Sequence, residues 1–255
     1  MSAHRSWVRT RRAASLALTT ILVFAANAGQ AQEDPPPKIL LKGRIIGGQH
    51  LLNPVWNEAK DPKNHRYTFR VPSATVNPAA RVLRAYLPRE LAIAAIAQEP
   101  VQPSSVPVNV HLSGGRTTPS TVVITVGQNV QFHNHDPFPH KLYDTAGVSG
   151  GMGPESTAAG KQRTWRPPAA GVYELRDKLI PSVRSWIVVE PKAAAMGSPN
   201  RKNEFVVPQL PPGSYQLQAY FAGKPVGTPV PVVVRPAPAI QPVGPALNLG
   251  TAASQ

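Results

Sequence analysis

Proline and glycine limit this chain to short secondary-structure elements. Its 255 residues include 30 prolines and 19 glycines. Proline removes a backbone hydrogen-bond donor and breaks helix interiors, whereas glycine favours turns. Because long helices are disfavoured over most of the sequence, the composition predicts short strands joined by tight turns. That combination is typical of an all-β sandwich.

The first 31 residues have the organisation of a secretory signal. A basic stretch from Arg5 to Arg12 precedes an apolar run from Ala13 to Ala26, and small residues up to Ala31 offer a cleavage site. The run is shorter than the roughly 18 to 20 residues that a membrane span requires, and no later segment is a candidate span. We therefore expect export to the periplasm or outer cell surface of a bacterium, with residues 32–38 forming a disordered leader.

The charge of the chain is strongly positive. The formal net charge is +14, and because residues 1–31 carry four arginines and no acid, the remainder keeps 23 basic and 13 acidic residues, or +10. In an exported protein such an excess favours an anionic envelope polymer or an envelope protein assembly as partner. The basic residues are scattered and follow no nucleic-acid-binding motif, so we expect no nucleic-acid partner. The alternative is that the charge serves solubility alone.

Residues 121–143 carry the most informative pattern. Val122, Ile124 and Val126 alternate, Gly127 turns the chain, and Val130 and Phe132 resume the alternation, which predicts a half-buried hairpin that feeds a loop. Strands are also expected at 39–46 and 108–112. For residues 88–98 the alanine-rich composition, with Pro88 at a first helical position, favours a short helix over a strand.

This pattern resembles the cupredoxin family, in particular cupredoxin-like proteins of the methylamine-utilisation type. The matching residues are Gly127, Val130, Phe132, Asn134, Asp136, Pro137, His140 and, later, Gly171, Val172 and Tyr173. The resemblance implies a Greek-key β-sandwich with a copper loop that supplies Cys, His and Met ligands. The corresponding positions here are Asp177, Ile180 and Val183, so of the expected ligands only His140 is kept. A blue-copper site requires a thiolate, and this chain has no cysteine, so type 1 copper chemistry is excluded.

A second resemblance involves both ends of the chain. The segment 203–217, with its Pro211-Pro212-Gly213 turn, and the segment 42–48 resemble the carboxypeptidase regulatory-like module, which is non-catalytic where it occurs. The resulting fold prediction is a cupredoxin-like sandwich interlocked with a second, small regulatory-like sandwich. We expect an N-terminal β region at 39–104, the cupredoxin-like unit at 105–192, regulatory-like strands at 193–234 and a flexible tail rich in Pro and Ala at 235–255.

Three histidines are the candidate ligands. Strand alternation places His133 and His135 side by side on an outer face with His140 on the loop beyond, and such a set could hold Cu(II) or Zn(II). The alternative is that these are surface and loop histidines without a ligand. For His140 a further alternative is a hydrogen bond to Asp177 that fills the vacated copper pocket, because a carboxylate stabilises a charged imidazole.

Two functional hypotheses follow. The first is an exported, non-enzymatic scaffold or interaction protein of the cell envelope that needs no cofactor. The second is a periplasmic copper- or zinc-binding protein without type 1 redox chemistry. The sequence contains no established catalytic motif, so we expect no enzymatic activity.

Overall fold

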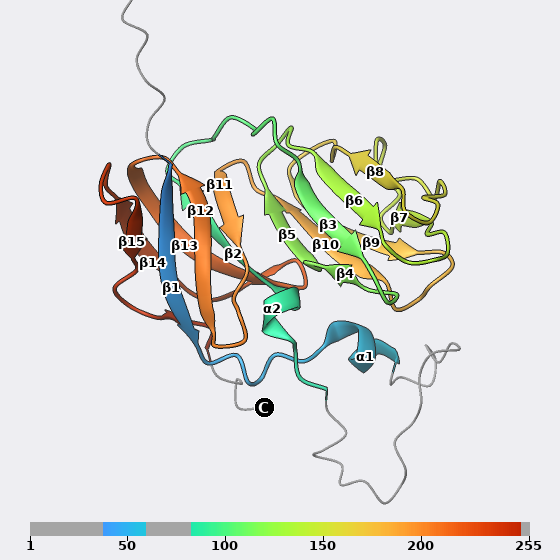
Figure 1. The fold of residues 1–255 in the computed structure, drawn as a ribbon, viewed down its shortest axis with the longest axis horizontal. Helices are drawn as coiled ribbons and strands as arrows, with labels where there is room; N and C mark the ends of the chain where they lie inside the picture. Colours follow the sequence, from blue (N-terminus) through green and yellow to red (C-terminus); the bar gives the residue numbers. More distant parts are fainter. Residues whose placement is uncertain (1–37, 60–82, 251–255) are drawn as a thin grey trace, which may run out of the picture. The chain divides into compact units, whose positions relative to one another are not determined.

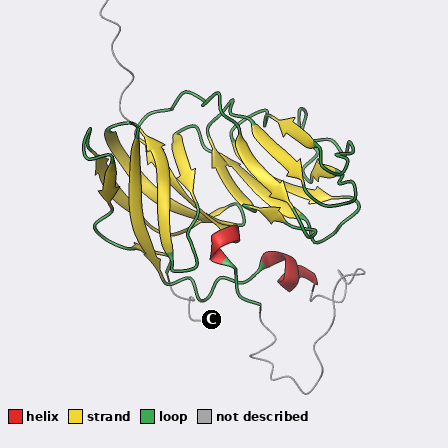
Figure 2. Ribbon diagram, in the orientation of Figure 1, coloured by secondary structure: helices red, strands yellow, loops and turns green. Residues whose placement is uncertain are grey.

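The structure is a computed structural model that describes residues 38–59 and 83–250. The expected signal segment, nearly all of the leader and residues 251–255 lie outside the described residues. Strands dominate the described part, with two short helices, α1 (Pro54–Ala59) and α2 (Leu87–Glu90) (Figures 1 and 2). Neither helix is long or apolar enough to cross a membrane.

Two four-stranded sheets form a first sandwich from the two ends of the described chain. One contains β12 (Glu204–Leu210), β1 (Ile39–Ile46) and β15 (Ile240–Pro242) in that order, with β16 (Leu247–Asn248) also on β1. The other has the order β11 (Ala193–Gly197), β2 (Leu91–Ala97), β13 (Gly213–Phe221), β14 (Lys224–Val234). Because β1 pairs antiparallel with β12, strands from distant parts of the sequence share one sheet.

The middle of the chain forms the second sandwich. Its first sheet has the order β5 (Thr121–Ile124), β10 (Arg184–Val189), β9 (Gly171–Asp177), β7 (Leu142–Asp144). Its second sheet has the order β4 (Thr117–Thr118), β3 (Val108–Leu112), β6 (Val130–Asn134), β8 (Gln162–Trp165). Phe132, Leu175 and Ile187 are fully buried between these two sheets. The all-β sandwich architecture predicted from composition is thus present.

A third, smaller core joins the two sandwiches. Ala92 and Ala94 of β2 lie in one buried cluster with Val123 of β5 and Val188 of β10. The alternate residues of the same strands face the interiors of their own sandwiches, as Leu91 and Ile93 do. The sheets that contain β2 and β5 are therefore apolar on both faces in this region.

This double burial explains why the helix prediction for residues 88–98 was wrong. Only the four residues of α2 are helical, and Leu91–Ala97 form the strand β2, whose first five residues are all buried. A strand that is covered on both faces shows a continuous apolar run, which periodicity alone does not distinguish from a buried helix. Small alanines on one face allow the neighbouring sheet to approach.

The hairpin prediction for residues 121–134 was also wrong. β5 pairs in parallel with β10, whereas β6 pairs in parallel with β3, so the two strands belong to opposite sheets of the second sandwich. Gly127, at φ 84°, turns the chain from one sheet to the other rather than closing a hairpin. All four residues of β5 are buried, because the strand lies between two cores.

The expected flexible tail is ordered as far as residue 250. β15 and β16 both add to β1 in parallel, and Leu247 and Leu249 are buried in the first core. The side-chain amide of Gln241 donates to the carbonyls of Arg235 and Pro238 at 2.6 and 2.9 Å. Apolar burial and free pairing positions on β1 together hold a segment whose composition predicted mobility.

Candidate functional site

The ring of His140 lies buried between two carboxylates. Its Nδ1 is 2.9 Å from Oδ2 of Asp177, and its Nε2 is 3.0 Å from Oδ2 of Asp136. His140 has no exposed surface, and both carboxylates are buried. An imidazole donates through both nitrogens only in its charged form, so the geometry suits an imidazolium between two carboxylates. The hydrogen bond that we expected between His140 and Asp177 is present, and Asp136 is an additional partner.

Asp177 also holds the loop that follows it. Its Oδ1 accepts the backbone N–H groups of Leu179 and Ile180 at 2.6 and 3.0 Å, and its Oδ2 accepts that of Lys141 at 3.0 Å. Val183 is fully buried in the core of the second sandwich, and Ile180 packs against the same core. The positions at which the cupredoxin resemblance implies copper ligands thus form hydrogen bonds and apolar contacts here.

Asp136 and Asn134 connect neighbouring loops. Asp136 accepts the N–H groups of Gly114 and Gly115 at 2.6 and 3.0 Å, and Nδ2 of Asn134 donates to three backbone carbonyls, including that of Phe138 at 2.9 Å. Burial is the largest single influence on the pKa of Asp136, and it raises that pKa. The hydrogen bonds from Gly115, Gly114 and His140 together lower the pKa by more than burial raises it. The pKa of this carboxyl therefore lies below its ordinary value.

The structure groups His133 and His135 with His111 rather than with His140. The ring centroid of His111 lies 5.3 Å from that of His133 and 5.1 Å from that of His135. Nδ1 of His111 is 2.8 Å from Nε2 of His135. Partial burial, followed by the nearby charges of His133 and His135, lowers the pKa of His111. Neutral rings can share an N–H···N hydrogen bond at this distance. Within residues 38–59 and 83–250, no three His, Asp or Glu side chains are arranged to hold a metal ion.

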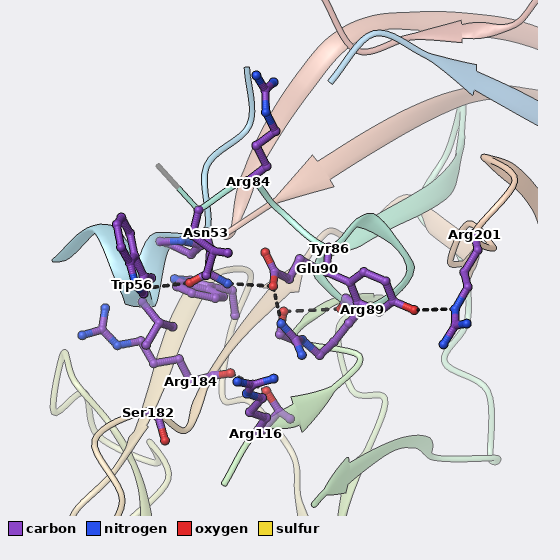
Figure 3. A pocket seen from close by; sticks show the side chains of 16 residues that line it. Asn53, Trp56, Arg84, Tyr86, Arg89, Glu90, Arg116, Ser182, Arg184 and Arg201 are labelled. Atoms are coloured by element: carbon purple, nitrogen blue, oxygen red, sulfur yellow. Dashed lines mark hydrogen bonds and ion pairs between the residues drawn. The ribbon is translucent and has the colours of Figure 1, made fainter. Parts of the chain in front are cut away.

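A cavity lies where the two sandwiches meet the two helices. It has a volume of about 580 Å³, within the range usual for ligand pockets. α1, α2, β4, β10 and the loops beside them supply its walls (Figure 3). Its lining residues include Trp56, Tyr86, Arg89, Glu90, Arg116, Ser182, Arg184, Trp186 and Arg201.

Five arginines and a single carboxylate line this cavity. Arg116 is exposed, and its side chain has no hydrogen bond or ion pair to another residue in the described ranges. The side chain of Arg184 is only 9% exposed, and its Nη1 contacts the carboxylates of Glu58 and Glu174. Its Nε–H is buried and has no hydrogen-bond partner among the described residues. A buried, unsatisfied donor costs about 1 to 3 kcal/mol, so this group suits an acceptor brought by a ligand.

Glu90 carries a buried acceptor that lacks a donor, the counterpart of the unsatisfied donor on Arg184. Its Oε1 accepts a hydrogen bond from Nδ2 of Asn53 at 2.8 Å and contacts the guanidinium of Arg89. Its Oε2 is buried without a hydrogen-bond partner among the residues that the structure describes. Two residues that line the cavity therefore carry one unsatisfied donor and one unsatisfied acceptor, on side chains that are more than nine-tenths buried.

Aromatic rings complete the walls. Trp186 on β10 is 8% exposed, and Trp56 on α1 and Tyr86 before α2 lie nearer the solvent. The hydroxyl of Tyr86 accepts a hydrogen bond from Nε of Arg201 at 3.1 Å, and that bond raises the pKa of Arg201. The cavity thus offers apolar faces beside a cluster of positive charges.

Sequence reasoning noted the excess charge but missed its concentration in this cavity. The five arginines, Arg84, Arg89, Arg116, Arg184 and Arg201, come from separate elements. No local motif connects them, and only the fold brings them together. His111 was missed for the same reason, because it reaches His133 through the parallel pairing of β3 with β6.

No protein-family model and no curated protein matches this chain. Among solved structures, amicyanin from Paracoccus versutus is 20% identical with a TM-score of 0.32, over 38% of this chain and 97% of amicyanin. An oxidized amicyanin mutant is 17% identical with a TM-score of 0.31, over 38% of this chain and 98% of its own. A purple cupredoxin from Nitrosopumilus maritimus is 19% identical with a TM-score of 0.29, over 32% and 99%. Similarity at this level is not evidence of a shared activity.

Proposed function

We propose that this protein is an exported, non-enzymatic binding protein of the bacterial cell envelope, and that its arginine-lined cavity takes an anionic group of the partner. The observation that carries the proposal is the buried Nε–H of Arg184, a residue that lines the cavity, which has no acceptor within the described residues. A ligand carboxylate or phosphate would satisfy it with a charge-assisted hydrogen bond.

The surroundings of Arg184 favour an anion over a neutral group. Four further arginines line the cavity, and Glu90 is the one acid among the lining residues. Arg116 is free to contact a ligand without first breaking an ion pair to another described residue. Positive charges gathered in a concave site attract anions and accelerate their association.

The polar groups of the cavity support a binding role rather than catalysis. The hydroxyl of Ser182 donates to the carbonyl of Gly115 at 3.0 Å, and that of Ser120 to the carbonyl of Arg89 at 3.4 Å. The lining residues include no histidine that could act as a base beside either serine. Activation of a serine nucleophile needs such a neighbour.

The second candidate function is binding of Cu(II) or Zn(II) by the histidines on the outer face of the second sandwich. The observation that favours it is the gathering of His111, His133 and His135, of which His133 and His135 line a hollow of about 300 Å³. His140 does not take part, because both of its ring nitrogens contact carboxylates. The nitrogens of His111 and His135 would have to exchange their mutual hydrogen bond for the metal. Titration with each ion, with His111→Asn as the variant, tests this candidate.

Retention of envelope components tests the first candidate. We would immobilise the wild-type chain and the double variant Arg116→Gln/Arg201→Gln, and compare what each retains from an envelope fraction at low and high salt. The control variant Arg44→Gln/Arg235→Gln removes the same charge from exposed positions outside the cavity. We expect wild type and control to retain the same anionic component, with loss at high salt, and the cavity variant to lose it at low salt. Equal retention by all three proteins would contradict the proposal.

A further inference from the structure

We propose that the ligand of the arginine-lined cavity is an acidic sugar, a hydroxylated ring that carries a carboxylate, such as a uronic acid residue of a polysaccharide. This inference rests on the proposed function, because it names the class of anion that the cavity takes. It is carried by three features of the walls: an unsatisfied donor, an unsatisfied acceptor and aromatic faces.

The two unsatisfied groups call for a ligand that both accepts and donates. Nε–H of Arg184 needs an acceptor, and Oε2 of Glu90 needs a donor, and both atoms are buried without partners among the described residues. A sulfate or a fully ionised phosphate has only acceptors, so it would leave Glu90 unsatisfied. Leaving a buried acceptor unpaired is costly, and sites built around such groups reject ligands that lack the matching donor.

The donor that reaches Glu90 is better supplied by a hydroxyl than by an ammonium group. Oε1 of the same carboxylate already contacts the guanidinium of Arg89, and five arginines line the cavity in all. A cationic ligand group would meet this excess of positive charge, whereas a hydroxyl donates without adding charge. A zwitterion such as a free amino acid is therefore the poorer fit.

The aromatic walls suit the ring of a sugar. Trp56, Tyr86 and Trp186 border the cavity, and Figure 3 shows Trp56 and Tyr86 beside the polar cluster around Glu90. The C–H face of a pyranose packs against indole or phenol rings, while its hydroxyls stay free to form hydrogen bonds. A cavity of about 580 Å³ accommodates one such ring with part of its neighbour in a chain.

Calorimetric titration of the full chain with ring-matched ligands tests the inference. The ligands are glucuronate, glucose, which lacks the carboxylate, and cyclohexanecarboxylate, which lacks the hydroxyls. We expect the Kd of glucuronate to be at least about tenfold lower than that of either analogue. In Glu90→Gln an amide N–H₂ takes the place of the unsatisfied oxygen. Loss of the negative charge should strengthen the binding of any anion, so we expect this variant to bind cyclohexanecarboxylate more tightly than wild type does. Because the acceptor for the sugar hydroxyl is gone, we expect it to bind glucuronate no more tightly than cyclohexanecarboxylate.

The outcomes separate this inference from the proposed function. If glucuronate and cyclohexanecarboxylate bind wild type equally well, or the latter binds better, the cavity takes anions but the sugar assignment is overturned. If glucose binds as tightly as glucuronate, the carboxylate plays no part and the assignment is likewise overturned. If glucuronate, cyclohexanecarboxylate and inorganic phosphate all fail to bind at millimolar concentration, both the proposed function and the sugar assignment are contradicted. The comparison of ligands on wild type decides the matter even if Glu90→Gln does not fold.

Discussion

His140 and Asp177, 37 residues apart in the sequence, lie in direct hydrogen-bond contact inside the second sandwich, with Nδ1 and Oδ2 separated by 2.9 Å. Asp177 stands where the cupredoxin resemblance implies a cysteine ligand. In this chain a carboxylate at that position binds the imidazole itself and three backbone N–H groups. The end of the sandwich is thus held by charge-assisted hydrogen bonds, which need no metal ion.

Substitution of Asp177 tests the structural role of this contact. Asp177→Asn replaces an acceptor oxygen by a donor beside the buried ring of His140 and the N–H groups around it. Loss of one partner from a buried charged pair costs about 3 to 5 kcal/mol, and we expect a loss of unfolding free energy of about 3 kcal/mol in urea titrations. Glu155→Gln is the control, since Glu155 is 69% exposed and its one ion pair within the described ranges is with Arg163. That variant should change stability by less than about 1 kcal/mol.

Acid should destabilise the protein through Asp136. The folded state lowers the pKa of this carboxyl below its ordinary value of 3.8. At a pH between the folded and the unfolded pKa of Asp136, the unfolded chain binds a proton that the folded chain does not. The contribution of Asp136 to the unfolding free energy is therefore fully present above about pH 4, and it is lost as the pH falls through the folded pKa. Urea midpoints measured from pH 6 to pH 2.5 should decline at the acidic end. The decline should be shallower in Asp136→Asn, and an unchanged slope would contradict the assignment.

Removal of metal ions should leave the fold intact. Because both nitrogens of His140 contact carboxylates, the interior cluster is complete without an ion. We expect dialysis against a chelator to shift the Tm by less than about 2 °C, which corresponds to under roughly 1 kcal/mol for a chain of this size. The protein should be purified from its native compartment without added metal. A larger drop in Tm that is reversed by Cu(II) or Zn(II) would show that a metal ion supports the structure.

Gly197 should be intolerant of any side chain. A Cβ at this position of β11 would collide with the carbonyl oxygen of Val206 on β12, which is backbone and cannot move aside cheaply. We expect Gly197→Ala to lower the unfolding free energy by about 2 to 3 kcal/mol, the upper part of the range of about 1 to 3 kcal/mol that is usual for overpacking. Gly244→Ala is the matched control, because nothing lies within 4 Å of a Cβ at Gly244. A neutral effect of Gly197→Ala would show that β11 and β12 do not approach as closely as described.

The sequence was most informative where pattern and packing agree. β1 and β3 have the limits that alternation and turn residues predicted, 39–46 and 108–112. It was least informative for strands covered on both faces. β2 is such a strand, and its continuous apolar run lacks the period of two that distinguishes a half-buried strand. In β5 the alternation of Val122 and Ile124 predicted a half-buried strand, but Val123 between them is buried as well.

The candidate site divides in the same way. The contact between His140 and Asp177 was predictable, because both residues fall at positions where the cupredoxin resemblance implies ligands of one site. The arginine-lined cavity was not, because Arg89, Arg116 and Arg184 belong to different elements and meet only through long-range packing. The net charge of the sequence indicates an anionic partner but contains no information about where the charges converge.

The most direct test of the central claim, that the cavity binds an anionic group, is to follow the side-chain N–H signal of Arg184 in proton–nitrogen correlation spectra during titration with propanoate. The signal is assigned by its loss in Arg184→Lys. Because this Nε–H is buried without an acceptor among the described residues, we predict a saturable shift with propanoate and none with the neutral propanamide. Arg116→Gln should weaken the propanoate response at least about threefold. No saturable shift at Arg184 or at any other arginine of the cavity, or an equal shift with propanamide, would contradict the account.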